Sequence, residues 1–105
     1  MINRIKLRLG LDDYSQDALL LELLKGAQDA ICLYVEEDEF PAYQLQTTAV
    51  MLTVDCYNRL GTEGMKSENK GSLSQSFYDD MLDPYKAVLD KYVAQKKAKK
   101  RVIFA

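Results

Sequence analysis

The segment that decides the fold is Ala42–Gly61, which reads AYQLQTTAVMLTVDCYNRLG. It contains no glycine or proline before Gly61, and its apolar residues recur at steps of three and four, which predicts a helix from about Ala42 to Leu60. The β-branched residues between Thr47 and Val54 would also suit a strand, but the unbroken length favours a helix. The apolar positions are Leu45, Ala49, Val50, Leu52, Val54, Cys56, Tyr57 and Leu60. Such a broad apolar sector belongs in the centre of a helical bundle.

Two further helices are expected before this central one. Apolar residues at helical spacing in residues 2–9 predict a short helix that ends at Gly10. A longer amphipathic pattern predicts a helix from about Gln16 to Val35, introduced by the cap residues Asp12, Asp13 and Ser15. After the acidic run at 36–39, Pro41 suits the first turn of the central helix.

The segment after the central helix changes pattern twice. Gly61 fits a helix end, and 61–71 is expected as a loop. Leu73, Gln75 and Phe77 alternate with serines, which predicts a short strand or an extended arm. A last helix is expected from about Asp83 to Lys97, with Asp83 as its cap and a proline in its first turn. The terminal RVIFA, residues 101–105, is apolar and strand-prone.

These patterns together predict one mainly all-α domain. Residues 1–95 are expected to form a small bundle of three to four helices. The segment 61–80 is expected as an extended loop or short β-hairpin between the central and last helices. Residues 96–105 are expected as a separate basic and apolar C-terminal tail.

Composition argues against catalytic and metal-dependent functions. The 105 residues include no histidine, so the commonest general base and metal ligand is missing. The two cysteines, Cys32 and Cys56, lack the CxxC spacing of zinc or redox motifs and are expected as reduced, buried thiols. No enzyme, cofactor or metal is therefore expected. No apolar run reaches the ~20 residues of a membrane span, and no signal-peptide core is present, which predicts a protein made in a cytoplasm.

Local clusters that resemble catalytic or ligand motifs have simpler interpretations. Gly61, Gly64 and Gly71 match neither dinucleotide-binding nor P-loop spacing. The carboxylates at 36–39 and 79–83 lack calcium-loop spacing and are expected as solvated charge. The serines at 67, 72, 74 and 76 have no histidine to activate them. The bias toward tyrosine, seven of ten aromatics, suits surfaces that become buried on assembly.

Charge is distributed unevenly along the chain. Residues 1–94 carry nine Lys/Arg against sixteen Asp/Glu, whereas residues 95–105 carry five Lys/Arg and no acid, for a net charge of −2. An acidic body with a basic tail does not favour a dedicated DNA-binding protein. It does indicate that the tail has its own partner, which charge alone leaves open between nucleic acid, an anionic membrane and an acidic protein surface.

Four segments, taken in order, resemble the head–tail connector (adaptor, head completion) proteins of tailed bacteriophages. They are IKLRLGL at 5–11, CYNRLG at 56–61, TEG at 62–64 and SQSF at 74–77. The resemblance covers nearly the whole chain. The lysine-rich tail and the RVIFA end depart from the pattern.

The resemblance implies a structural virion protein at the head–tail interface, assembled in the host cytoplasm, with no enzymatic activity and no membrane contact. It implies a ring of copies, a dodecamer in the virion, beneath the portal protein. The ring would extend the DNA channel, lie close to packaged DNA without reading its sequence, and dock a stopper or tail-completion protein.

Two groups of residues are candidates for these contacts. The portal-binding candidates lie in the tail, where RVIFA would add a strand to an edge of the partner: Lys96, Lys97, Lys99, Lys100, Arg101, Val102, Ile103 and Phe104. The candidates for an inter-subunit or channel-lining loop are Gly61, Glu63, Gly64, Lys66, Glu68, Lys70, Ser74, Phe77 and Tyr78.

The alternative function is a small helical DNA-binding regulator, such as a repressor or antitoxin. That function requires a basic recognition helix. The central helix contributes only Arg59 and is otherwise mostly apolar, which argues against it.

Overall fold

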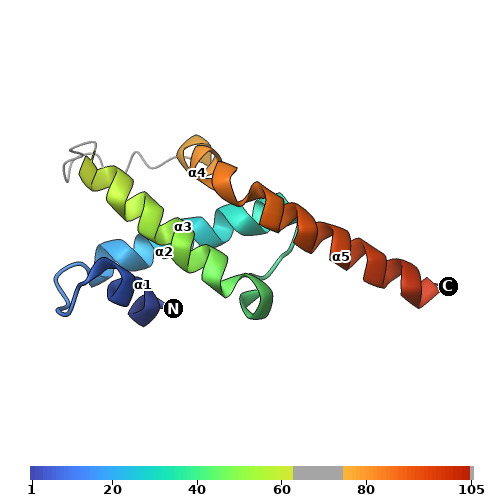
Figure 1. The fold of residues 1–105 in the computed structure, drawn as a ribbon, viewed down its shortest axis with the longest axis horizontal. Coiled ribbons are helices and arrows are strands. Elements are labelled where there is room, and N and C mark those ends of the chain that lie inside the picture. The colour runs from blue at the N-terminus through green and yellow to red at the C-terminus, as the bar shows by residue number, and fades with distance from the viewer. Residues whose placement is uncertain (63–74, 105) are drawn as a thin grey trace.

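The computed structural model describes residues 1–62 and 75–104, with side chains described for 1–60 and 76–98. In chain order the elements are α1 (Ile2–Leu9), α2 (Asp17–Val35), α3 (Ala42–Thr62), α4 (Gln75–Leu82), the 3₁₀ turn η2 (Asp83–Tyr85) and α5 (Lys86–Phe104). Figure 1 shows these helices and the position of both chain ends. The predicted all-α bundle is confirmed, and the described residues contain no strand.

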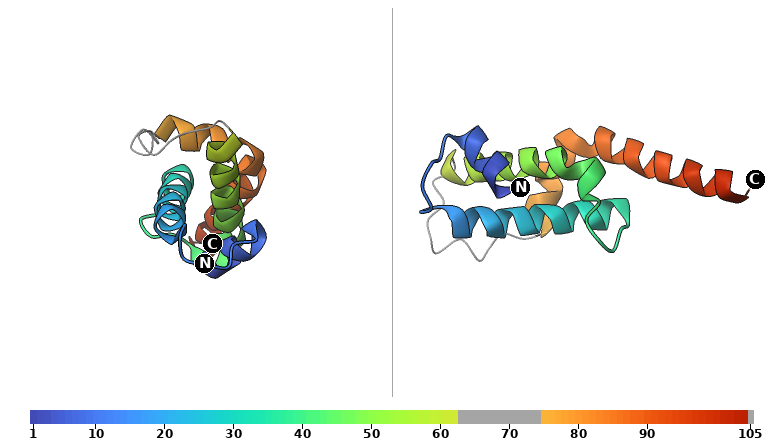
Figure 2. Two further views of the ribbon diagram at one scale, coloured as in Figure 1. Left: turned by 90° about the vertical axis from the view of Figure 1, so that its left-hand side faces the viewer. Right: turned by 90° about the horizontal axis from the view of Figure 1, so that it is seen from below.

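The core lies mainly between α2 and α3, which run in opposite directions side by side (Figure 2). The apolar stripes of both helices face each other there, as their sequence spacing predicts. The fully or almost fully buried side chains of this pair are Leu20, Leu23, Leu24, Ala27, Ala30, Ile31, Val35, Leu45, Ala49, Val50, Leu52, Thr53 and Cys56. Thr53 satisfies its buried hydroxyl by donating to the carbonyl oxygen of Ala49 at 2.8 Å.

The short helix α1 packs against α3 and closes one side of the core. Ile5 is fully buried, and the Arg4 guanidinium donates to Gln46 at 2.8 Å and to Thr47 at 3.0 Å. Gly10 ends the helix in the left-handed conformation (φ 72°), which glycine adopts without steric cost. The chain can therefore turn sharply from α1 into α2.

The boundaries of α2 and α3 follow the prediction closely. Glu36 ends α2 with a left-handed backbone (φ 61°), the only such non-glycine residue among those described. Pro41 lies just before α3, and its carbonyl oxygen accepts from the Leu45 amide at 3.0 Å. At the other end α3 continues through Gly61 to Thr62, so the predicted stop at Gly61 is two residues early. Glycine costs a helix only about 1 kcal/mol relative to alanine.

The predicted extended arm is wrong where the structure describes it. Residues 75–82 form the helix α4, so Gln75 and Phe77 do not belong to a strand. The physical reason is burial: Phe77, Tyr78, Met81 and Leu82 share one side of a helix and pack onto the core. The expected loop over 61–80 is thus shorter, and its middle part, residues 63–74, lies outside the described residues.

A close approach fixes α4 against α2. Tyr78 is only 7% exposed and lies over Gly26. A Cβ atom at position 26 would be 2.2 Å from the Tyr78 hydroxyl oxygen. The glycine inside α2, which weakens the isolated helix, is therefore required for helix–helix contact.

The last helix is longer than predicted. Asp83 does not cap it but begins η2, where its carboxylate pairs with Lys86 at 2.8 Å. From Lys86 the helix continues without a break to Phe104, so the expected strand in residues 102–104 is wrong. The helix α5 crosses the predicted boundary between residues 95 and 96 without a break.

The molecule is elongated because α5 extends beyond the other helices (Figure 1). Its principal extents are 53 × 27 × 21 Å. Along the described residues, no helix is long and apolar enough to cross a membrane.

Candidate docking site at the last helix

The last helix rests on the body through its first three turns. Leu89 is fully buried, and Tyr85, Tyr92 and Val93 are half-buried against the core. Val88 remains 49% exposed. The apolar contact of α5 with the body is therefore narrow and is limited to its proximal half.

Hydrogen bonds between tyrosines and carboxylates add to this contact. The Tyr34 hydroxyl on α2 donates to Asp90 on α5 at 2.6 Å. The Tyr85 hydroxyl donates to Asp55 on α3. The Tyr92 hydroxyl donates to Glu37, just after α2, at 2.5 Å. Each bond links η2 or α5 to α2, to α3 or to the connection after α2, and together they orient the last helix relative to α2 and α3.

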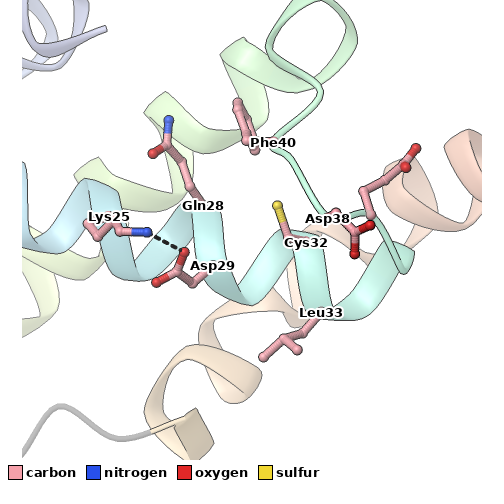
Figure 3. Close-up of a pocket in the computed structure, with 8 residues that line it drawn as sticks. Lys25, Gln28, Asp29, Cys32, Leu33, Asp38 and Phe40 are labelled. Atoms are coloured by element: carbon pink, nitrogen blue, oxygen red, sulfur yellow. Dashed lines mark hydrogen bonds and ion pairs between the residues drawn. The ribbon is translucent and has the colours of Figure 1, made fainter.

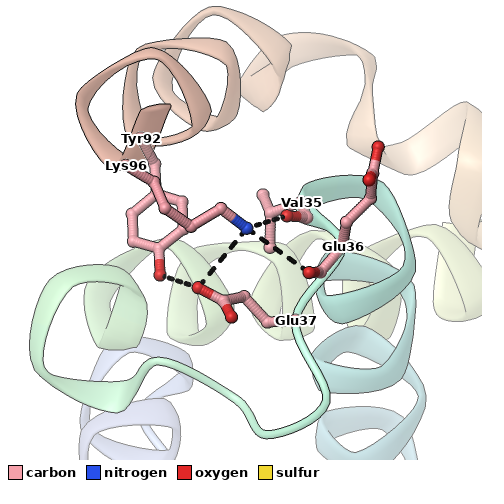
Figure 4. Close-up of polar contacts among 5 residues, drawn as sticks. All are labelled: Val35, Glu36, Glu37, Tyr92 and Lys96. Carbon is pink, nitrogen blue, oxygen red and sulfur yellow. Dashed lines mark hydrogen bonds and ion pairs between the residues drawn. The ribbon is translucent and has the colours of Figure 1, made fainter. Parts of the chain in front are cut away.

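Lys96 makes the contact farthest along α5 with described side-chain geometry (Figure 4). Its ammonium donates to the carbonyl oxygens of Val35 at 2.8 Å and Glu36 at 3.3 Å, and lies 3.6 Å from the Glu37 carboxylate. The last carbonyls of a helix lack intrahelical donors and carry partial negative charge. Lys96 of α5 therefore serves as the cation at the C-terminal end of α2.

These contacts raise the pKa values of the tyrosines. The hydrogen bond to Glu37, with burial second, raises the pKa of Tyr92 to about 12. The bond to Asp90 raises the pKa of Tyr34, and burial with the bond to Asp55 raises that of Tyr85. All three phenols remain protonated donors at neutral pH, so the links are intact there.

The predicted portal-binding residues divide into two groups in the structure. Lys96 points back to the body and is engaged by α2 and Glu37. Lys97 is exposed. The remaining candidates lie on the helical backbone of α5, and their side chains are outside the described set: Lys99, Lys100, Arg101, Val102, Ile103 and Phe104. We call residues 97–104 the α5 tip.

The predicted inter-subunit loop is only partly described. Gly61 belongs to α3, and Phe77 and Tyr78 belong to α4, where Tyr78 is part of the core rather than of a loop. The other candidates lie outside the described residues: Glu63, Gly64, Lys66, Glu68, Lys70 and Ser74.

A surface groove that the sequence reasoning did not predict lies along the second half of α2 (Figure 3). We call it the α2 groove. Its volume is about 520 Å³, and it is lined by Lys25, Gln28, Asp29, Cys32, Leu33, Glu37, Asp38 and Phe40. Lys25 and Asp29 pair across one helical turn at 2.9 Å. The signals in the sequence were Leu33, outside the apolar stripe of α2, and Phe40, next to four consecutive acids.

The α2 groove does not resemble a catalytic site. Its thiol, Cys32, has a pKa raised by burial, which disfavours the reactive thiolate. Within the described ranges no group of three His, Cys, Asp or Glu side chains is placed to bind a metal. The groove instead presents apolar area, from exposed Leu33 and half-buried Phe40, beside charged side chains, and an apolar centre with a polar rim is typical of docking surfaces.

Comparison with known proteins identifies the class of this small helical bundle. The family of phage gp6-like head-tail connector proteins matches residues 1–92. The match covers most of the chain, and the chain belongs to this family. No curated protein and no solved structure matches it. Family membership indicates a structural role in joining phage head and tail, a place in the virion, and contact with head and tail components.

Proposed function

We propose that the chain is the subunit of a ring that lies beneath the portal at the head–tail interface. The ring extends the DNA channel and offers its other face to a stopper or tail-completion protein. Family membership supports a structural joining role of this kind. A ring of identical subunits requires two different faces on each copy that meet around a closed circle, and an elongated protomer with a projecting helix has room for both.

The observation that carries the proposal is the continuation of α5 past Lys96 as a helix. The α5 tip adds eight residues, about 12 Å at 1.5 Å per residue. Because Lys96 is engaged within the chain, the portal contact that we propose is restricted to residues 97–104. A helix that enters a groove replaces the added strand as the docking mode.

The composition of the α5 tip suits a stable protein–protein contact. Three apolar residues, Val102, Ile103 and Phe104, follow the cations. Full burial of each such side chain contributes about 1.5–3 kcal/mol. Apolar burial of this size, unlike exposed ion pairs, persists at high salt.

The charge of the body suits a channel for DNA. Residues 1–94 carry a clear excess of acid, and like charge keeps DNA from adhering to a wall along which it slides. We propose the segment that begins at Gly61, with Glu63, Gly64, Lys66, Glu68, Lys70 and Ser74, as the channel-facing or inter-subunit loop.

The portal contact is tested by deletion of residues 101–105. The shortened chain should fold, because no described core residue lies beyond Leu89, but should fail to bind purified portal in a pull-down assay. The matched control is Leu7→Ser, which changes an apolar residue that is 82% exposed on α1. Full portal binding by the shortened chain would contradict the portal contact.

The wider role is tested in particles. Phage that lack the protein should package DNA but lose it, and should not accept tails. Ring formation is tested by native mass spectrometry of the protein with and without portal, where a complex with many copies per portal ring is expected. Particles that retain genome and tails without the protein would overturn the proposal.

A further inference from the structure

The α5 tip is a cationic helix end by its sequence. After Asp90 the sequence contains six Lys/Arg and no acid. Lys97 is exposed and forms no ion pair with the described part of the chain. The distal part of α5 leads away from the other helices in Figure 1 and in the right-hand view of Figure 2. The tip extends a helix that is already formed from Lys86, and its place beyond the other helices leaves it accessible to a surface on another molecule.

The α2 groove has the opposite character. Leu33, 62% exposed, and half-buried Phe40 supply apolar area, while Asp38 belongs to the acidic connection between α2 and α3. A neighbouring hollow of similar size is formed by residues 37–41. Asp38 and Glu39 are exposed and have no ion pair among the residues with described side chains. The groove therefore combines an apolar lining with the negative charge of Asp38, which forms no ion pair with any described side chain.

Both surfaces belong to the same chain, and within one copy α5 touches the edge of the groove at Glu37, which accepts from Tyr92 and faces Lys96. Lys96 also contacts the end of α2 (Figure 4), and the last helix then continues beyond the other helices (Figure 1). We propose that the start of the α5 tip of one copy, around Lys97 and Ala98, lies at the α2 groove of a second copy, with Lys97 next to Asp38 and Glu39 of that copy. The contact is heterologous: two different surfaces meet, and its repetition gives either a closed ring or a filament.

This inference rests on the proposed ring and specifies the pair of faces that would form it. It uses the start of the tip, around Lys97 and Ala98, and leaves residues 102–104 for the portal. The occupant is a second copy because the positive charge around Lys97 complements the negative charge of Asp38 and Glu39, and both occur on this chain.

Cys32 makes the contact directly testable, because it lines the α2 groove. A donor copy carries Ala98→Cys together with Cys32→Ser, and an acceptor copy keeps the natural Cys32 and carries a mass tag. Equal amounts are mixed with diamide, which takes up the two electrons and two protons released when two thiols form a disulfide. Cys56 is fully buried and stays out of reach in both copies.

The expected product is a covalent donor–acceptor pair on a non-reducing gel. The matched control is Ala87→Cys with Cys32→Ser, which places an exposed thiol eleven residues earlier on α5, about 16 Å away along the helix. A disulfide requires Cα atoms about 4.4–6.8 Å apart, so position 87 should be trapped far more slowly. Asp38→Lys with Glu39→Lys in the acceptor should slow trapping at position 98 about tenfold, since two attractive contacts become repulsive.

Each outcome has a defined meaning. Equal trapping at 98 and 87, or trapping at 98 that ignores the charge reversal, overturns the inference. So does a charge reversal that reduces portal binding of the protein but not pairing of copies, since the groove would then receive the portal. Rings that form on portal without trapping at 98 reject this contact and keep the proposed function. Trapping without any portal-bound ring keeps the contact and rejects the proposed function.

Discussion

The α2–α3 pair and the helix α5 are joined to the rest of the molecule in different ways. α2 alone contributes seven buried apolar residues, whereas the described part of α5 contributes only Leu89. Where α5 meets α2, two tyrosine–carboxylate hydrogen bonds and Lys96 provide most of the specific contact. Burial of one large apolar side chain contributes about 1.5–3 kcal/mol and one hydrogen bond about 0.5–1.5 kcal/mol net. The α2–α3 pair therefore supplies most of the stability, whereas the polar contacts of α5 fix the direction in which that helix leaves the body.

The largest effect is expected from a cavity between α2 and α3. Leu52→Ala removes a fully buried side chain and should lower the free energy of unfolding by about 2–5 kcal/mol. Val88→Ala on α5, where the side chain is half exposed, should cost less than about 1 kcal/mol. Urea denaturation followed by circular dichroism measures both. Equal losses would show that α5 shares the core more evenly than its burial indicates.

A smaller loss is expected at the contact of α2 with α4. Gly26→Ala should lower stability by about 1–2 kcal/mol, because the overpacking against Tyr78 exceeds the gain in helix propensity. Combination with Tyr78→Leu should be clearly less than additive in a double-mutant cycle. Lys25→Ala, one residue away and exposed, is the control. Additive losses would contradict the close approach.

The polar contacts that hold α5 against the end of α2 are tested by substitution of Glu37. Glu37→Gln keeps the shape but removes the charge that faces both Tyr92 and Lys96. Global stability should fall by about 1 kcal/mol or less, while hydrogen exchange of the α5 amides should accelerate much more than exchange in α2. A uniform acceleration across both helices would show that α5 does not open separately.

Alkaline pH should weaken the same link. The pKa of Tyr92 is raised from 10.0 to about 12 by its hydrogen bond to Glu37. The bond therefore stabilises the folded chain fully below pH 10, and this contribution is lost as pH rises from 10 through about 12. Ultraviolet difference titration of the natural chain against Tyr92→Phe isolates this phenol. In the Glu37→Gln background its pKa should move down toward 10, and an unchanged value would exclude the hydrogen bond as the cause.

The smallest effect is expected from an exposed ion pair at the start of α5. Lys86 and Asp83 are 44% and 70% exposed in their side chains. Lys86→Ala should change the free energy of unfolding by less than about 0.5 kcal/mol, and high salt should remove the difference. A loss above 1 kcal/mol would show that the polar contacts of α5 contribute substantially to stability and do not only orient the helix.

The sequence predicted the helices whose apolar residues repeat over several turns. α1, α2 and α3 were predicted within two residues at each end because Gly10, the α2 apolar stripe and Pro41 are local signals. Helix α4 was missed because the alternation of Leu73, Gln75 and Phe77 with serines resembles a strand. What decides its conformation is the burial of Tyr78 on Gly26, a contact between residues 52 positions apart.

The candidate site was predicted less completely than the fold. The sequence marks residues 96–104 by charge, but no local pattern shows that Lys96 turns back to the end of α2 while Lys97 faces outward. The strand expected in residues 102–104 followed from residue type alone, whereas a helix already formed from Lys86 extends at little further cost. The α2 groove depends on where the connection at residues 36–41 lies in space, which spacing does not reveal.

The overhang of α5 also determines how the free protein moves in water. A compact chain of this length has a radius of gyration of about 13 Å, whereas the molecule described here has 15.2 Å. An elongated particle rotates slowly end over end, and this rotation sweeps a larger volume than a sphere of equal mass occupies. The projecting helix therefore increases the distance at which the subunit can first touch another molecule. If α5 folded back onto the body, X-ray scattering in dilute solution would show a decrease of about 2 Å in the radius of gyration.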